Sequence, residues 1–107
     1  MAKAEIFAGA CGFKTLVQAT KNGNRNVLLS IESECSAIQK LAAELNEVDP
    51  MQHITARRQV PPVLQAGLKH CTHAACPVPV GIIKALEVEA GLNLPVDVTI
   101  KVSQEPS

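Results

Sequence analysis

Apolar and polar residues alternate along the first third of the chain, as they do in β-strands with one buried face. The alternation predicts strands over residues 4–8, 13–20 and 27–32. Turns separate them at 9–12 and at 21–25, where an Asn-Gly pair supplies the positive φ angles of a tight hairpin. This part of the chain is therefore predicted to form three strands joined by short connections.

The spacing of the apolar residues then changes to three and four, which predicts a helix that begins just after Cys35. Ser36 and Gln39 have the spacing of a capping box at its start, and the pair Asp49-Pro50 ends it. Its apolar stripe consists of Ile38, Leu41, Ala42, Leu45 and Val48.

The second half of the chain is predicted to contain two more helices and a last strand. Residues 51–62 read as an irregular connection, and a short helix follows over 63–70. A further helix spans about 79–90, with Gly91 just beyond its end. Val, Ile and polar residues then alternate over 96–102, which predicts a strand.

These elements predict an α+β fold in the order β-β-β-α-α-α-β. We expect a two-layer sandwich in which the helices pack on one face of a three- to four-stranded antiparallel or mixed sheet. A length of 107 residues predicts a single domain, 1–107. Leu16 and Leu28 interrupt the polar outer face and could mark a homodimer contact, although isolated exposed leucines are also common.

The direction of successive elements predicts that all four cysteines of the chain lie at one end of the molecule. Cys11 lies in the turn that follows the first strand, and the third strand runs back to the same end, at Cys35. The first helix leads away, the short helix over 63–70 returns to Cys71, and the next helix leaves after Cys76. A misread element between 50 and 70 would move Cys71 and Cys76 to the opposite end.

Four thiolates are enough to hold a metal ion or an inorganic cluster. The candidate ligands, for a metal or a cofactor alike, are Cys11, Cys35, Cys71 and Cys76. Gly9 and Gly12 would let the backbone approach an inorganic core, and two of the cysteines precede helices, whose free N–H groups favour thiolates. We expect an iron–sulfur cluster, such as a 4Fe–4S cluster, or zinc.

Other interpretations of these residues stay open. Free cysteine behaves as a small buried hydrophobe, so an interaction domain with buried cysteines is an alternative. His70 and His73 flank Cys71 and are expected to have a structural role or to hydrogen-bond a ligating sulfur rather than to ligate. His53 is expected to be a surface or loop residue.

Composition narrows the function classes and the compartment. Ten basic residues balance ten acidic ones, and aromatic residues are nearly absent, which disfavours nucleic-acid binding. Glu5 interrupts the only stretch where a signal peptide would lie, and no run reaches the roughly 18 apolar residues of a membrane span. We therefore expect a cytoplasmic protein with reduced thiols. We find no paired carboxylates, phosphate-binding loop or nucleophile–histidine–acid set, so hydrolase or kinase chemistry has no support. Whether the protein is an enzyme stays open, although the sequence favours a non-enzymatic role.

Three segments also resemble a family of small, uncharacterised four-cysteine proteins from anaerobic bacteria and archaea. They are Cys11-Gly12-Phe13, the isolated Cys35, and the stretch 73–88, which begins His-Ala-Ala-Cys-Pro-Val-Pro. The resemblance implies a metal or cluster site at the four cysteines. The protein would then act in electron transfer, or as an accessory of a redox system with a protein partner.

A local resemblance supports another function. Cys76-Pro77-Val78-Pro79, at the start of a helix, is similar to the Cys-Pro-x-Pro motif of TusA-type sulfur carriers, which hold a persulfide on the cysteine. In that family the motif follows the first strand, whereas here it lies late in the chain. The resemblance implies sulfur transfer through Cys76 as the alternative function.

Overall fold

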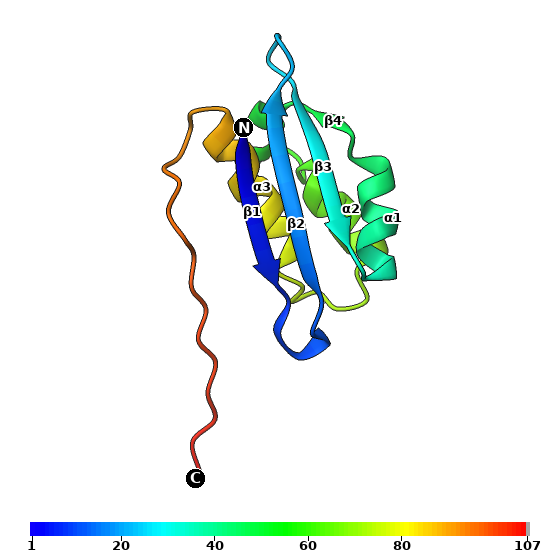
Figure 1. Cartoon of the computed structure of the whole chain (residues 1–107), viewed down its shortest axis with the longest axis vertical. Coiled ribbons are helices and arrows are strands. Elements are labelled where there is room, and N and C mark those ends of the chain that lie inside the picture. The colour runs from blue at the N-terminus through cyan, green and yellow to red at the C-terminus, as the bar shows by residue number, and fades with distance from the viewer. Residues whose placement is uncertain (107) are drawn as a thin grey trace.

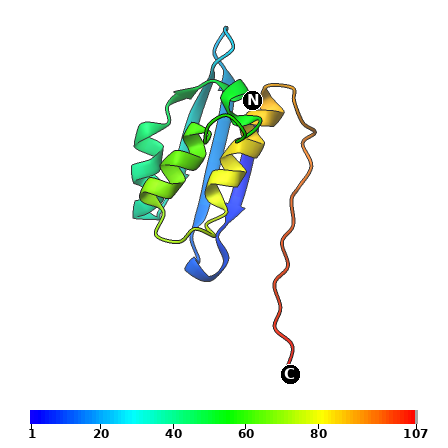
Figure 2. The same cartoon turned by 180° about the vertical axis from the view of Figure 1, so that it is seen from behind.

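The computed structural model of the protein describes residues 1–106; Ser107, the last residue of the predicted domain, lies outside the described part. One layer is an antiparallel sheet whose strands keep their sequence order, β1 (Ala2–Phe7), β2 (Lys14–Lys21), β3 (Val27–Ser33) and β4 (Glu47–Val48). Helices cover one face of it, α1 (Ser36–Glu44), α2 (Pro62–His70) and α3 (Val78–Glu89) (Figure 1, Figure 2). The predicted two-layer α+β fold is confirmed.

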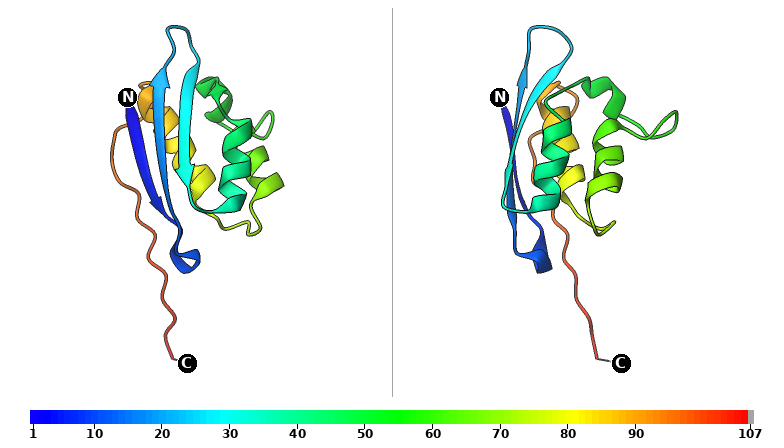
Figure 3. Two further views of the ribbon diagram at one scale, coloured as in Figure 1. Left: turned by 45° about the vertical axis from the view of Figure 1, so that its right-hand side comes forward. Right: turned by 90° about the vertical axis from the view of Figure 1, so that its right-hand side faces the viewer.

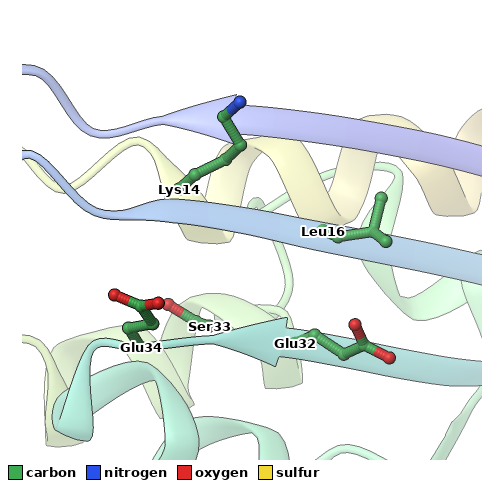
Figure 4. A pocket seen from close by; sticks show the side chains of 5 residues that line it. All are labelled: Lys14, Leu16, Glu32, Ser33 and Glu34. Atoms are coloured by element: carbon green, nitrogen blue, oxygen red, sulfur yellow. The ribbon is translucent and has the colours of Figure 1, made fainter.

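Alternation along the strands divides the sheet into a core face and a solvent face, as predicted. Thr15, Val17 and Ala19 of β2 are buried beneath the helices. The outer face carries Lys14, Leu16 and Glu32, which line a shallow open depression (Figure 4). Phe13, expected inside the second strand, precedes β2 and is 39% exposed.

The helices close the core from the other side. The largest fully buried side chains come from all three helices as well as from the strands, and include Ile38 and Leu41 of α1, Val63 of α2, and Ile82 and Leu86 of α3. Because each helix buries one apolar stripe, burial of that stripe is the main stabilising force of the domain. In the part of the chain that the structure describes, no helix combines the length and the apolar character needed to cross a membrane.

The first helix is shorter than predicted. It ends at Glu44, and Leu45 leaves the helical region of the backbone with φ −120° and ψ 67°. Val48 is buried as expected, but it belongs to β4 and lies beside Val27 of β3. The predicted helix continued through Val48 because a spacing of three residues from Leu45 fits a helix as well as it fits the observed change from α1 to β4.

The connection predicted as irregular contains a short 3₁₀ helix, η2 (Pro50–His53). Its start is fixed by Asp49, whose side-chain Oδ1 accepts a hydrogen bond from Met51 N–H at 2.9 Å. Pro50 suits the first helical position because its ring presets φ and it has no N–H to leave unpaired.

The predicted last strand is wrong. Residues 94–106 form no strand, and this segment runs away from the body of the molecule after α3 (Figure 1). Its alternating apolar side chains are exposed, since no neighbouring strand lies against it in the described chain. The alternation therefore predicted an extended conformation correctly, but it could not show whether another strand pairs with the segment.

We expect Gly81→Ala to destabilise the fold because Gly81 is where α3 packs most closely on the sheet. A Cβ atom at Gly81 would collide with the side chain of Ile6 in β1. Because overpacking of this kind forces neighbours to shift, the free energy of unfolding should fall by about 1–3 kcal/mol. Val80→Ala, at an exposed position of the same helix, is the control and should leave denaturant unfolding nearly unchanged. Equal unfolding midpoints for the two variants would contradict this contact.

Candidate functional site

Cys35 lies at the junction of β3 and α1 and is held there by the backbone. It is the N-cap residue of α1, and its carbonyl accepts the first helical hydrogen bond from Gln39 N–H at 3.0 Å. Its own N–H donates to Ser33 Oγ at 3.2 Å, and Thr15 Oγ1 donates to the same oxygen at 3.0 Å. Cys35 is thus tied to the start of β2.

The predicted capping box at this helix is wrong. Cys35, not Ser36, is the N-cap, and no side chain caps the first turn. Gln39 Nε2 instead donates to the Ser33 carbonyl at 2.8 Å. The side chain therefore still fixes the entry to α1, but through the strand end rather than through the cap.

Cys71 and Cys76 bracket the connection between α2 and α3. Cys71 is the C-cap of α2, and its N–H donates to the Gly67 carbonyl at 2.9 Å. Cys76 N–H donates to the His73 carbonyl at 3.2 Å, which folds the connection into a tight turn before α3. This turn places Cys76 close enough to Cys71 to raise the pKa of the Cys71 thiol.

Cys71 lies near both Cys76 and Cys35. Burial, the adjacent Cys76 and the nearby Cys35 together raise the pKa of Cys71 to about 11, and burial has the largest effect. All three side chains are partly buried and pack against the hydrophobic core. Residues far apart in the sequence are therefore brought together at the ends of β3, α2 and α3.

The surroundings of Cys11 differ from those of the other three cysteines. It is the last residue of the 3₁₀ turn η1 (Gly9–Cys11) between β1 and β2, and its side chain is exposed. Gly9 and Gly12 have φ angles of 82° and 75°, which only glycine adopts readily, so the turn depends on both. The turn nevertheless lies at the same end of the molecule as the β3–α1 and α2–α3 connections (Figure 1, Figure 3).

All four thiols are free, and they do not form a ready-made metal site. Within residues 1–106, no group of three or more His, Cys, Asp or Glu side chains is arranged to hold a metal ion. Cys35, Cys71 and Cys76 are close enough to affect one another without having the geometry of ligands. Coordination would require the thiols to reorient and the Cys11 turn to approach them.

An apolar cavity of about 390 Å³ opens beside Cys71 and Cys76. Leu64, Leu68 and Val80 contribute to its wall, and His73 lies at the same opening. No sequence pattern predicts this cavity, because its wall combines side chains from α2, α3 and the connection before α2. It leaves the two thiols accessible to a small molecule or a partner.

The histidines have different roles. His70 Nε2 forms an ion pair with Glu44 at 2.6 Å, and hydrogen bonds from Lys69 and His70 lower the pKa of that carboxyl. His70 therefore links α2 to α1, which agrees with the structural role predicted for it. His53 is only 4% exposed, so the expectation of a surface histidine is wrong.

We expect alkylation of Cys71 in the metal-free protein to depend on pH far above the range of ordinary thiols. The thiolate is the reactive form, so the rate should keep rising to about pH 11, where half of the Cys71 thiol is ionised. Exposed Cys11 should be modified first and serves as the internal control. Mass spectrometry after timed iodoacetamide treatment measures both rates. A Cys71 rate that levels off near pH 9 would contradict the raised pKa.

Comparison with known proteins identifies a family without assigning a function. No curated protein and no solved structure is significantly similar to the chain. A family model described as a family of unknown function, DUF6951, matches residues 2–102, which includes all four cysteines and most of the segment after α3. The chain therefore belongs to the DUF6951 family.

Proposed function

We propose that this protein is a small cytoplasmic protein that binds an iron–sulfur cluster or a zinc ion through Cys11, Cys35, Cys71 and Cys76. It would serve as an electron-transfer or accessory component of a redox system. One observation carries the proposal: Cys35, Cys71 and Cys76, from separate parts of the chain, gather against the core at the end where the Cys11 turn also lies.

The chemistry of the donors fits such a group. Thiolates are the preferred ligands of iron–sulfur clusters and suit structural zinc equally well. Close thiolates repel one another, and a bound cation offsets that repulsion. The Cys11 turn, which is exposed and flanked by glycines, can supply the fourth sulfur by moving as a unit.

The protein purified without oxygen should contain iron and acid-labile sulfide, or else zinc, at about one site per chain. The sequence contains neither tryptophan nor tyrosine, so a cluster absorbing near 400 nm would dominate the spectrum. Elemental analysis and sulfide determination distinguish the two metals. A colourless, metal-free and fully folded protein would refute the proposal and favour an interaction domain with buried cysteines.

Sulfur transfer through Cys76 is the second candidate. Cys76 is two residues before α3 begins, contacts the Cys71 thiol and lines the apolar cavity, so a donor could reach it. The Cys76 thiolate would attack the terminal sulfur of a donor persulfide, forming a persulfide on Cys76 and releasing the donor as a thiolate. Mass spectrometry would show the added sulfur as a gain of about 32 Da on Cys76 alone.

A further inference from the structure

The segment that follows α3 presents an apolar face that no other part of residues 1–106 covers. We define the tail as residues 92–106. Apolar and polar residues alternate along it, and the apolar ones are exposed, for instance 76% for Ile100 and 90% for Val102. The tail makes the molecule 53 Å long, against 28 Å in the other two directions (Figure 1). An isolated strand is not stable in water, and pairing with an open sheet edge would both bury such an apolar face and satisfy its backbone groups.

The sheet offers one long open edge. β1 pairs with β2 on one side, and no strand of residues 1–106 pairs with its other side. Ala4 and Ile6, on the core side of β1, are only partly buried, as is Val88 of α3. An added strand would complete the burial of these side chains and the hydrogen bonding of the edge.

The pattern of charges on the tail complements β1. When the tail is placed parallel to β1 with Val96 beside Ala2, Val98 and Ile100 lie beside Ala4 and Ile6 on the core side. On the solvent side Asp97 then lies beside Lys3. Lys101 lies beside Phe7, which is two residues after Glu5 on the same face of β1. At this diagonal position the Lys101 side chain can reach the Glu5 carboxylate.

We propose that two copies of this chain form a dimer by exchanging their tails, each tail pairing with β1 of the other copy. The tail begins near the start of its own β1 and then runs apart from that strand without joining the sheet (Figure 1). A twofold exchange uses both tails and both β1 edges, so this contact closes at two copies. The family model also extends through residue 102, so the family's common region includes residues 92–102 of the tail.

The mass of the full chain in reducing buffer tests the dimer. Sedimentation equilibrium should give twice the 11.3 kDa of one chain, and the reductant excludes disulfide-linked pairs. Ile100→Lys should weaken the dimer roughly 100-fold, because it buries a charge on the core side. Thr99→Lys adds the same charge on the solvent side and should leave the dimer intact. Neither residue is buried in a single chain, so the subunit should stay folded.

Further variants test the register. Lys3→Asp and Asp97→Lys should each weaken the dimer, and the double variant should recover it. A single-chain mass at every concentration would overturn the proposal, and in that case amide exchange shows whether the tail pairs with its own β1. A dimer that Ile100→Lys does not weaken would overturn it equally. None of these outcomes depends on the metal content of the protein.

Discussion

Serine in place of Cys35, Cys71 or Cys76 is expected to reduce the metal or cluster content of the protein to less than about one-tenth of the wild-type value. Ligands of one site act as a unit, so the loss of any one sulfur affects the whole group. Cys11→Ser should have the same effect on metal content. Iron, sulfide and zinc analysis of proteins prepared without oxygen measures each loss.

Metal-free proteins should distinguish Cys11 from the other three. Cys11 is exposed, so Cys11→Ser should leave the melting temperature of the apoprotein unchanged. The other three thiols pack against the core, so serine there should lower it by a few degrees. Thr72→Ala, at an exposed position between Cys71 and Cys76, is a control that should keep both metal and stability.

The same variants separate the two proposed functions. A sulfur carrier needs one thiol, so only Cys76→Ser would then abolish persulfide loading. If the other three substitutions left loading, metal content and melting temperature unchanged, the four-thiolate proposal would be wrong. If all four substitutions had no effect in either assay, both proposals would fail.

Hydrophobic periodicity predicted the strands and helices that bury one face against the core. β2 and β3 were predictable because Val17, Ala19 and Val27 alternate with polar residues and a turn separates the strands. The end of α1 was not, because Leu45 and Val48 continue the helical spacing although the backbone already leaves the helix at Leu45. Hydrophobic periodicity indicates which residues are buried. A continued helix and a helix followed by a strand can place the same residues in the core, so the spacing does not distinguish them.

The candidate site could be predicted only as far as topology determines it. The direction of successive elements placed the cysteine-bearing connections at one end, but not the distances between sulfurs, which depend on how α2 packs against α1 and α3. Close contact of Pro79 with Gly67, where a Cβ would lie 2.7 Å from the proline ring, sets the position of α3 against α2. Nothing in the sequence identifies that contact in advance.

His53 shows the same limit for a buried polar group. Its Nδ1–H donates to the Asp49 carbonyl at 3.0 Å, and its Nε2 accepts a hydrogen bond from Val63 N–H at 3.3 Å. The ring thereby joins η2 to the first turn of α2. The Asp-Pro start of η2 was visible in the sequence, but the partner at Val63 was not.

We expect His53→Ala to cost about 2–4 kcal/mol of stability, because it opens a cavity and leaves the buried Val63 N–H without its acceptor. For a domain of this size that corresponds to a melting temperature lower by roughly 10–20 °C. Lys69→Ala, which removes an exposed ion pair with Glu44, is the matched control and should change stability by less than about 1 kcal/mol.

The pH dependence of stability should depend on the same residue. Burial lowers the pKa of His53 below its ordinary value of 6.5, although the hydrogen bond to Asp49 and the Asp49 charge oppose the shift. The unfolded chain therefore takes up a proton first, so the contribution of neutral His53 is complete above pH 6.5 and is lost as the pH falls through the lowered pKa. Protonation of Nε2 also removes its ability to accept the hydrogen bond from Val63 N–H.

Thermal unfolding between pH 7.5 and 5 should thus show a steeper decline of the melting temperature for the wild type than for His53→Ala. Parallel declines would mean that His53 is not the group whose protonation destabilises the fold.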